Sequence, residues 1–207
     1  MAIARRAPPQ RAASASGASG RAPGAANRVR VIGGQYRRRL LDFPDAAGLR
    51  PTPDRVRETL FNWLGQDLPG WDCLDLFAGS GALGFEAASR GAARVVMVER
   101  DARAAAALAG NRAMLGATAV EIQRGDALAW LGASRERFDL IFVDPPFDGD
   151  LAVRALADIG AHLKPGGRVY VEQGTWVVPP PGFIMHRSGR VGRSHFALLV
   201  EEPSPPC

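Results

Sequence analysis

The stretch CLDLFAGSGALG, Cys73 to Gly84, carries glycines in the spacing G-x-G-x-x-G, at Gly79, Gly81 and Gly84. An acidic residue, Glu99, lies twenty residues after Gly79. Glycines let a backbone approach a ligand closely, and a carboxylate at the end of the next strand can bind both hydroxyls of a ribose. The pattern therefore predicts a site for a cofactor that contains a ribose, either NAD or S-adenosylmethionine (SAM).

Two further acids favour SAM. Asp75 lies four residues before Gly79, where a carboxylate would repel the pyrophosphate of a dinucleotide but attract the ammonium and sulfonium groups of SAM. Asp126, in RGDAL, follows the third predicted strand, where it can accept a hydrogen bond from an adenine amine. Asp126 is also suited to cap the helix that begins after it, and both roles can hold together.

A second motif predicts the reaction. FDLIFVDPPF ends the fourth predicted strand with Asp144-Pro145-Pro146-Phe147. The amine of a nucleobase is a poor nucleophile, and acceptors from Asp144 and a neighbouring carbonyl would localise its lone pair and aim it at the SAM methyl group. Phe147 can stack on the base, worth ~1–3 kcal/mol. We expect methyl transfer that depends on positioning and electrostatics, without a metal. The alternative is a Pro-Pro strand terminator with a core phenylalanine.

These motifs need elements that position them, and alternating strands and helices follow Gly70. The predicted strands are Leu74–Phe77, Val95–Val98, Val120–Gln123, Phe138–Val143 and Arg168–Glu172. The predicted helices are Leu83–Arg90, Ala102–Leu115 and Leu151–Leu163, the last ended by Gly166-Gly167. FIMHRSGRVGRSHFALLVEE reads as a terminal hairpin. The pattern predicts an α/β fold: a mostly parallel sheet with helices on both faces and one antiparallel strand at or near the edge.

The segment before this sheet predicts a small extension. RVRVIGGQYRRRLLDF reads as two strands joined by a tight turn at Gly33-Gly34. RPTPDRVRETLFNWL reads as a helix that Thr52 caps, with Pro53 in the first position and Asp54 at the positive end.

Length and composition suit one domain. Of the 207 residues, we expect 1–27 to be a disordered tail, 28–70 to form the N-terminal hairpin and helix, and 71–202 to form the cofactor domain. No apolar run approaches the ~18 residues of a membrane span. The two cysteines predict neither a disulfide framework nor a metal cluster. We expect a cytoplasmic monomer.

Charge is uneven along the chain. Residues 1–57 hold twelve Arg and three Asp, a net charge of +9, whereas residues 58–207 sum to −4. A basic front on an acidic body predicts contact with phosphate, although a solvated charged tail is the plainer interpretation.

The motifs together resemble a known family. RVIGGQYRRRLL, GLRPTPDRVRETLFNWL, CLDLFAGSGALGFEAASRGA, VVMVERD and DPPF occur in the order expected of the bacterial 16S rRNA guanine-N2 methyltransferases of the RsmD type, which have a Rossmann-like SAM-dependent methyltransferase fold. The resemblance covers about residues 28–200 and implies methylation of one guanine amine in 16S rRNA, within the small ribosomal subunit or an assembly intermediate.

The resemblance also implies roles for individual residues. The guanine would be held by Asp144, Pro145 and Phe147. The predicted cofactor residues are Asp75, Phe77, Gly79, Ser80, Gly81, Glu99, Arg100, Asp126, Ala127, Thr52 and Asn62. The predicted RNA-binding residues are Arg28, Arg30, Tyr36, Arg37, Arg38, Arg39, Arg50 and Arg57.

Other functions stay open at this point. The same DPPF chemistry suits a DNA adenine or a protein glutamine amide, and a non-catalytic RNA-binding assembly factor could keep the fold. Several residues are expected to have structural roles only: the histidines His162 and His186 at the surface and His195 in a strand, and the tryptophans Trp63, Trp71, Trp130 and Trp176 in packing.

Overall fold

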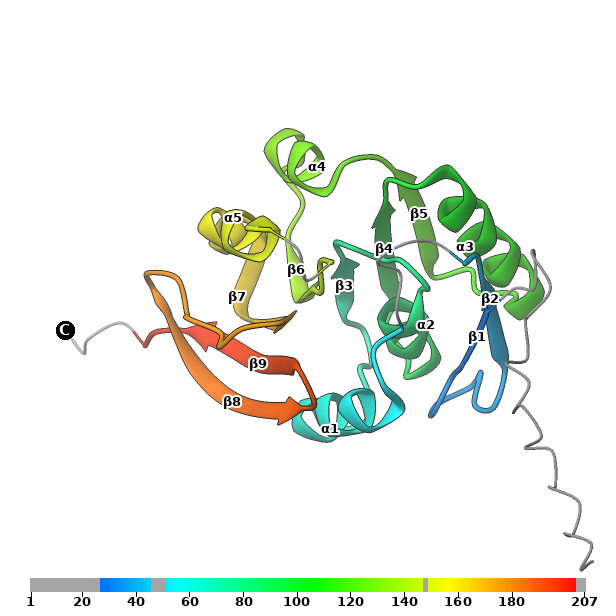
Figure 1. Cartoon of the computed structure of the whole chain (residues 1–207), viewed down its shortest axis with the longest axis horizontal. Coiled ribbons are helices and arrows are strands. Elements are labelled where there is room, and N and C mark those ends of the chain that lie inside the picture. Colours follow the sequence, from blue (N-terminus) through cyan, green and yellow to red (C-terminus); the bar gives the residue numbers. More distant parts are fainter. Residues whose placement is uncertain (1–26, 46–50, 147–148, 204–207) are drawn as a thin grey trace, which may run out of the picture.

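The computed structural model describes residues 27–45, 51–146 and 149–203. Its main sheet contains β3 (Asp72–Asp75), β4 (Arg94–Glu99), β5 (Val120–Arg124), β6 (Phe138–Val143), β7 (Leu163–Gln173), β8 (Phe183–Val191) and β9 (Ser194–Glu201). The strand order is β5-β4-β3-β6-β7-β9-β8 (Figure 1). β3 to β7 are parallel, and β9 is antiparallel to both its neighbours.

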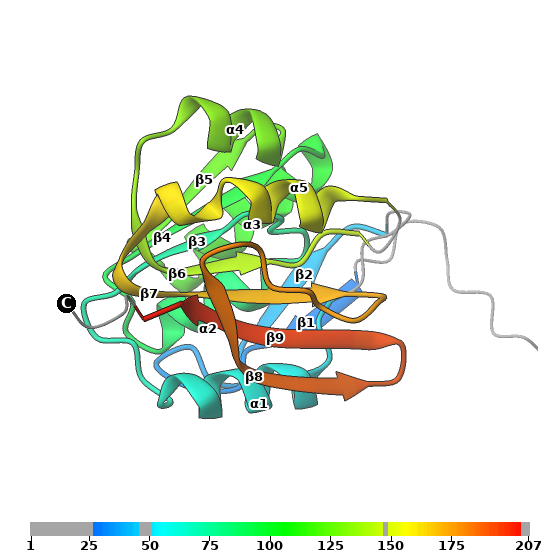
Figure 2. The same cartoon turned by 90° about the vertical axis from the view of Figure 1, so that its left-hand side faces the viewer.

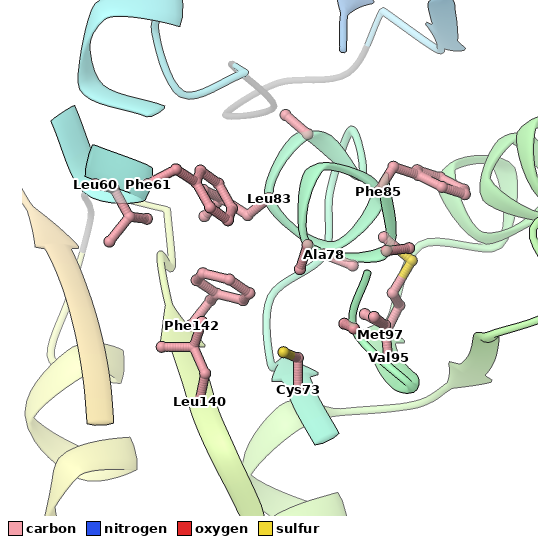
Figure 3. Packing of buried hydrophobic residues seen from close by; sticks show 14 of the residues in the cluster. Leu60, Phe61, Cys73, Ala78, Leu83, Phe85, Val95, Met97, Leu140 and Phe142 are labelled. Carbon is pink, nitrogen blue, oxygen red and sulfur yellow. The ribbon is translucent and has the colours of Figure 1, made fainter. Parts of the chain in front are cut away.

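Helices cover both faces of this sheet. They are α1 (Asp54–Leu64), α2 (Ala82–Ser89), α3 (Ala102–Leu115), α4 (Ala127–Ala133) and α5 (Leu151–Ala157), with a short 3₁₀ helix at Ile159–His162. Figure 2 shows α4 and α5 on one side of the sheet and α1 and α2 on the other. Each side encloses its own hydrophobic cluster. In the α1 cluster, Phe61 packs on Phe142 with ring centroids 6.3 Å apart (Figure 3).

Local sequence explains these elements. β4 and β6 are almost continuously apolar because helices cover both of their faces. α3 begins where the Asp101 carboxylate accepts hydrogen bonds from the backbone N–H groups of Arg103 and Ala104, each at 2.9 Å. It ends at Gly116, which has a φ of 63°.

The predicted fold class is confirmed, including one antiparallel strand, β9, next to the edge. One helix prediction is wrong in its second half. α5 ends at Ala157, and β7 begins at Leu163, so Gly166-Gly167 lie within a strand. The pairing of β6 with β7 shifts register there, and a Cβ on Gly167 would lie 2.9 Å from the Lys164 carbonyl oxygen. These glycines therefore allow the close backbone approach at the register shift in β7, and they do not end a helix.

The N-terminal strands exist but their connection differs from the prediction. β1 (Asn27–Arg30) pairs with β2 (Leu40–Phe43), and residues 31–39 join them in place of a tight turn at Gly33-Gly34. The reason is contact with α2. A Cβ on Gly34 would lie 1.8 Å from the Ser89 carbonyl oxygen, so the glycine allows this segment to approach the helix. β1, β2 and α1 contribute to the same hydrophobic cluster as β3, β4 and α2.

A buried ion cluster joins the N-terminal segment to the sheet. The Glu86 side chain on α2 is fully buried and accepts hydrogen bonds from the backbone N–H groups of Ile32 and Gly33, each at 2.8 Å. It also pairs with Arg57, at 3.3 Å, and with Arg90, at 2.8 Å. Buried charges require such partners, because desolvation without them costs several kcal/mol.

Replacing Arg57 tests this cluster. We expect Arg57→Met to lower the free energy of unfolding by about 3–5 kcal/mol, because Glu86 then lacks one of its two cationic partners. Chemical denaturation of the purified variant measures this loss. Arg55→Met, on the exposed face of the same helix, is the matched control and should change stability by no more than about 0.5 kcal/mol. Equal losses in the two variants would contradict the role of the cluster.

Candidate active site

Three acids end neighbouring parallel strands at one edge of the sheet. Asp75 ends β3, Glu99 ends β4 and Asp144 directly follows β6. The chain winds outward from β3 to β5 in one direction and from β6 to β7 in the other. The carboxyl edge at such a reversal is where open α/β sheets bind ligands. The fold thus brings the glycine loop and the DPPF motif to one place.

The glycine loop between β3 and α2 is held by Glu99. One carboxylate oxygen accepts a hydrogen bond from the Gly79 N–H at 2.8 Å, and the other accepts one from the Asp101 N–H at 2.7 Å. Gly79 and Gly81 have φ values of 51° and 80°. A Cβ on Gly81 would also lie 2.6 Å from Cδ2 of Leu108. Each carboxylate oxygen can accept a second hydrogen bond, so Glu99 shapes the loop and keeps acceptors for a ligand.

Asp75 lies beneath this loop. Its side chain is buried, and Oδ2 accepts a hydrogen bond from the Gly84 N–H at 2.9 Å, in the first turns of α2. Burial raises the pKa of Asp75 to about 7; the Gly84 bond opposes the rise, and the nearby charge of Glu99 adds to it. A cation bound at the loop would favour the ionised form and lower this pKa. Asp75 therefore supports the loop and makes it receptive to positive charge.

Three other predicted cofactor residues flank the loop in sequence. Phe77 is half-buried and packs against the hydrophobic cluster on the side of the sheet that α4 and α5 cover. Ser80 is buried, and its hydroxyl oxygen accepts a hydrogen bond from the Ala82 N–H at 3.4 Å. Arg100 is exposed directly after β4. Their contacts with a cofactor stay a prediction.

Asp126 follows β5 at the same edge. Its carboxylate accepts a hydrogen bond from the Ala129 N–H at 2.9 Å, so the predicted cap of α4 is confirmed. Ala127, the first residue of this helix, is buried. The Gly125 N–H donates to the Glu99 carbonyl at 3.0 Å, which holds this turn beside the end of β4. Asp126 itself is exposed and available to a ligand as well.

Asp144 is half-buried and oriented by a residue from a distant segment. The Thr52 hydroxyl donates to its Oδ2 at 2.8 Å, across 92 residues of sequence. The predicted helix cap at Thr52 is wrong, because Pro53 takes the cap position without a side-chain hydrogen bond. Thr52 instead reaches the site. Pro145 is buried beside Asp144, and Phe147 lies outside the described residues.

A second acid, Glu172, stands beside Asp144 and was missed by sequence analysis. β6 and β7 pair in parallel through Val143 and Val171, so Asp144 and Glu172 follow at adjacent positions. Glu172 is 2% exposed and accepts hydrogen bonds from the Tyr170 hydroxyl at 2.8 Å and the Ser194 hydroxyl at 2.6 Å. An acid at the carboxyl end of an apolar strand was the available signal.

The two carboxyls influence one another. Burial raises the pKa of Asp144 well above its ordinary value, the negative charge of Glu172 raises it further, the Thr52 bond opposes the rise, and Asp75 adds to it. Burial also raises the pKa of Glu172, against the hydrogen bonds from Ser194 and Tyr170. Like charges close together cannot both ionise easily, so the pair is suited to hold a proton.

Two predicted site residues lie elsewhere. Arg57, predicted as an RNA contact, is fully buried and donates to the Thr52 carbonyl at 3.2 Å and the Arg30 carbonyl at 2.9 Å. Asn62 is exposed and forms a hydrogen bond with Gln66. It lines a surface cavity of about 410 Å³ together with Arg37. Its contact with a cofactor stays a prediction. Arg57 instead supports the backbone of Thr52.

The other predicted RNA-binding residues belong to the N-terminal segment. Arg37, Arg38 and Arg39 are exposed on the connection that packs against Ser89, at the end of α2 opposite the glycine loop. Tyr36 is half-buried against the core. Arg28 forms an exposed ion pair with Asp42, and Arg30 forms one with Asp54. Arg50 lies outside the described residues.

The fold and the site define a Rossmann-like methyltransferase. The solved structure of yhhF from Escherichia coli aligns with a TM-score of 0.76 and 38% identity, covering 86% of this chain and 100% of that one. The 16S rRNA N2 G1207 methyltransferase RsmC from Thermus thermophilus, solved with AdoMet and guanosine, shares the fold with a TM-score of 0.62 and 24% identity, over 88% of this chain and 52% of that one.

Sequence comparison gives the family. The family model described as Conserved hypothetical protein 95 matches residues 29–200, so the chain belongs to this family. Ribosomal RNA small subunit methyltransferase D of Escherichia coli K12 is 40% identical over 180 residues, which cover 84% of this chain and 90% of that protein. The predicted resemblance to the RsmD type is confirmed.

The described residues were expected to lack a metal cluster and a membrane span. Within residues 27–45, 51–146 and 149–203, no three His, Cys, Asp or Glu side chains gather in a way that would hold a metal ion. In the same ranges, no helix has both the length and the apolar character needed to cross a membrane.

Replacing Glu172 tests the carboxyl pair. We expect Glu172→Gln to lower the pKa of Asp144, because a negative charge that disfavours its ionisation is gone. A carbon-13 NMR titration of the aspartate carboxyls measures this pKa. Glu201→Gln, exposed at the far end of β9, is the control and should leave it unchanged.

The pair also has a consequence for stability. A carboxyl whose pKa is raised by folding binds more protons in the folded chain. Its contribution to stability is therefore most favourable below about pH 4 and declines as the pH rises through the pKa of the folded state. The wild-type protein should therefore lose more stability with rising pH than Glu172→Gln. An unchanged Asp144 titration in this variant would disprove the coupling.

Proposed function

We propose that this protein is a SAM-dependent methyltransferase that methylates the exocyclic N2 amine of one guanine in the 16S rRNA of the small ribosomal subunit. The proposal rests mainly on the position of Asp144-Pro145. These residues lie beside the glycine loop, whose Gly79 N–H donates to Glu99, at the point where the strand order reverses between β3 and β6. The 40% identity to a protein named Ribosomal RNA small subunit methyltransferase D supports ribosomal RNA as the substrate. The guanine amine follows from the DPPF chemistry and the family resemblance.

The residues at the loop fit SAM. Glu99 keeps acceptor capacity for ribose hydroxyls, because each of its oxygens holds one backbone N–H. Asp75, with its raised pKa, gains from a nearby positive charge. Asp126 presents an exposed carboxylate after β5, suited to an adenine amine. A pyrophosphate would add negative charge beside these acids, so the site favours SAM over NAD.

SAM, when bound, supplies a methyl group attached to a positively charged sulfur. The Asp144 carboxylate and the Pro145 carbonyl would accept the two N–H bonds of the guanine amine and turn its lone pair toward that methyl group. Thr52 orients the Asp144 carboxylate by donating to Oδ2 at 2.8 Å. Catalysis in this arrangement comes from position and preorganised charge.

Methyl transfer would form the nitrogen–carbon bond as the carbon–sulfur bond of SAM breaks, and the amine would then have to release a proton. Asp144 would contact that nitrogen. Glu172 lies next to Asp144, and its carboxylate oxygens accept hydrogen bonds from the Tyr170 and Ser194 hydroxyls. Because the two carboxyls repel one another when ionised, the pair takes up a proton more readily than a single exposed carboxyl. We assign Asp144 as the proton acceptor and Glu172 as the residue that positions its charge.

The proposed partner is 16S rRNA in the small subunit or an assembly intermediate, in the cytoplasm. One chain supplies all the residues named here, so a monomer suffices. The guanine amine must leave any paired setting to reach Asp144, and we expect a flipped or loop nucleotide.

Methyl transfer from labelled SAM tests the proposal directly. The substrates are small subunits that lack the modification, naked 16S rRNA and duplex DNA, with small subunits from modification-competent cells as the matched control. We expect N2-methylguanosine from the unmodified subunits, identified by mass spectrometry, and little transfer to the control subunits. Equal transfer to duplex DNA, or a methylated base other than guanine, would contradict it.

A further inference from the structure

The C-terminal hairpin reaches the same edge of the sheet as Asp144. β9 runs antiparallel to β7, with His195 paired to Gln173, so the first residues of β9 lie beside the carboxyl end of β7. β8 ends at Val191, which pairs with Ser194. The turn between them therefore projects at the carboxyl edge. Figure 2 shows this turn on the side to which the arrows of β6 and β7 point.

This hairpin is basic. The sequence from Phe183 to Ser194 contains Arg187, Arg190 and Arg193 and no acidic residue. All three arginines are exposed. Arg190 stands opposite His195 in the pairing of β8 with β9, and its Nε donates to the Gly192 carbonyl at 3.0 Å. The two arginines nearest the turn, Arg190 and Arg193, thus present positive charge beside the site.

An exposed tryptophan lies next to these arginines. Trp176 follows β7 and is 58% exposed, so it does not lie in the core. Its indole meets the His195 ring edge to face, with centroids 5.9 Å apart, and its carbonyl accepts a hydrogen bond from Gln173 Nε2 at 2.9 Å. Val177, the next residue, is 2% exposed and anchors the segment. The ring is therefore held in place with much of its surface in solvent.

We propose that Trp176, Arg190 and Arg193 form a binding surface for single-stranded RNA, which holds the nucleotides that flank the target guanine. Trp176 would stack on an unpaired base, and the arginines would bind the neighbouring phosphates. This inference rests on the proposed function and names where its substrate docks.

The N-terminal arginines are less well placed for this role. Arg37, Arg38 and Arg39 lie beyond the C-terminal end of α2, whose eight residues span about 12 Å from the glycine loop. Figure 2 shows the connection between β1 and β2 on the side of the molecule opposite the β8–β9 turn. RNA that delivers a base to Asp144 would reach the C-terminal hairpin at the same edge.

Binding of the full-length variants to unmodified small subunits tests the surface, measured without turnover in the presence of the demethylated cofactor product. We expect Trp176→Ala to weaken binding roughly 5- to 150-fold, the range for loss of one stacked base. Trp176→Phe should retain most of the affinity. Val178→Ala, on a side chain 73% exposed in the same segment, is the matched control and should bind as wild type does.

The arginines are tested by salt dependence. We expect Arg190→Ala with Arg193→Ala to reduce the slope of log affinity against log salt concentration by about 1.4, the value for two phosphates of a single strand. The exposed pair Arg135→Ala with Arg137→Ala, just before β6, is the control and should leave the slope unchanged.

The outcomes separate this inference from the proposed function. If Trp176→Ala and the double variant at Arg190 and Arg193 bind and respond to salt as their controls do, the proposed RNA-binding surface is disproved, even if the protein methylates the subunit. If Trp176→Ala and Trp176→Phe weaken binding equally, stacking is overturned. If the wild-type protein binds the subunit without methylating it, the function fails while the comparison of variants still decides the surface. Melting temperatures and SAM affinities equal to wild type show that the variants are folded.

Discussion

The rest of the site depends on the hydrogen bonds and ion pairs that the buried Glu86 carboxylate forms. It lies on α2, the helix that begins at the glycine loop, and it satisfies two backbone N–H groups of the N-terminal segment and two arginines. Arg57, one of these arginines, also donates to the Thr52 carbonyl, and Thr52 donates to Asp144. A continuous chain of hydrogen bonds therefore joins the helix of the cofactor loop to the residue proposed to hold the substrate. Since its inner members are buried, the chain has few alternative arrangements.

Negative charge gathers at the same edge at some cost to stability. Asp75, Asp144 and Glu172 all have pKa values raised chiefly by burial. Such groups oppose folding when ionised, and a bound cation relieves part of this cost. The positively charged cofactor and the developing charge on the guanine nitrogen would supply that relief. The acids would then favour the charges that form during the reaction.

Much of this arrangement could be predicted from sequence. The alternation of predicted strands and helices predicted the parallel sheet. The glycine loop and the DPPF motif were each predicted to follow a strand, and the parallel order of these strands brings the two motifs together. The burial of Arg57 was not predicted, because a charged residue in a helix is ordinarily exposed. The available signal was its place among Val56, Leu60, Phe61 and Leu64, the buried stripe of α1. The pairing of Thr52 with Asp144 spans 92 residues and has no local signature. Trp176 was expected to be a packing residue, and its exposure could not be predicted because it depends on how the segment after β7 leaves the sheet.

The role of Asp144 is tested by the single-turnover rate of methyl transfer by the Asp144→Ala variant, with SAM affinity measured on the same preparation. We expect the rate to fall by about 10²-fold or more, because the amine loses its oriented acceptor, and SAM affinity to stay close to that of the wild-type protein. A rate near that of the wild-type protein would contradict the assignment of Asp144 and the mechanism built on it.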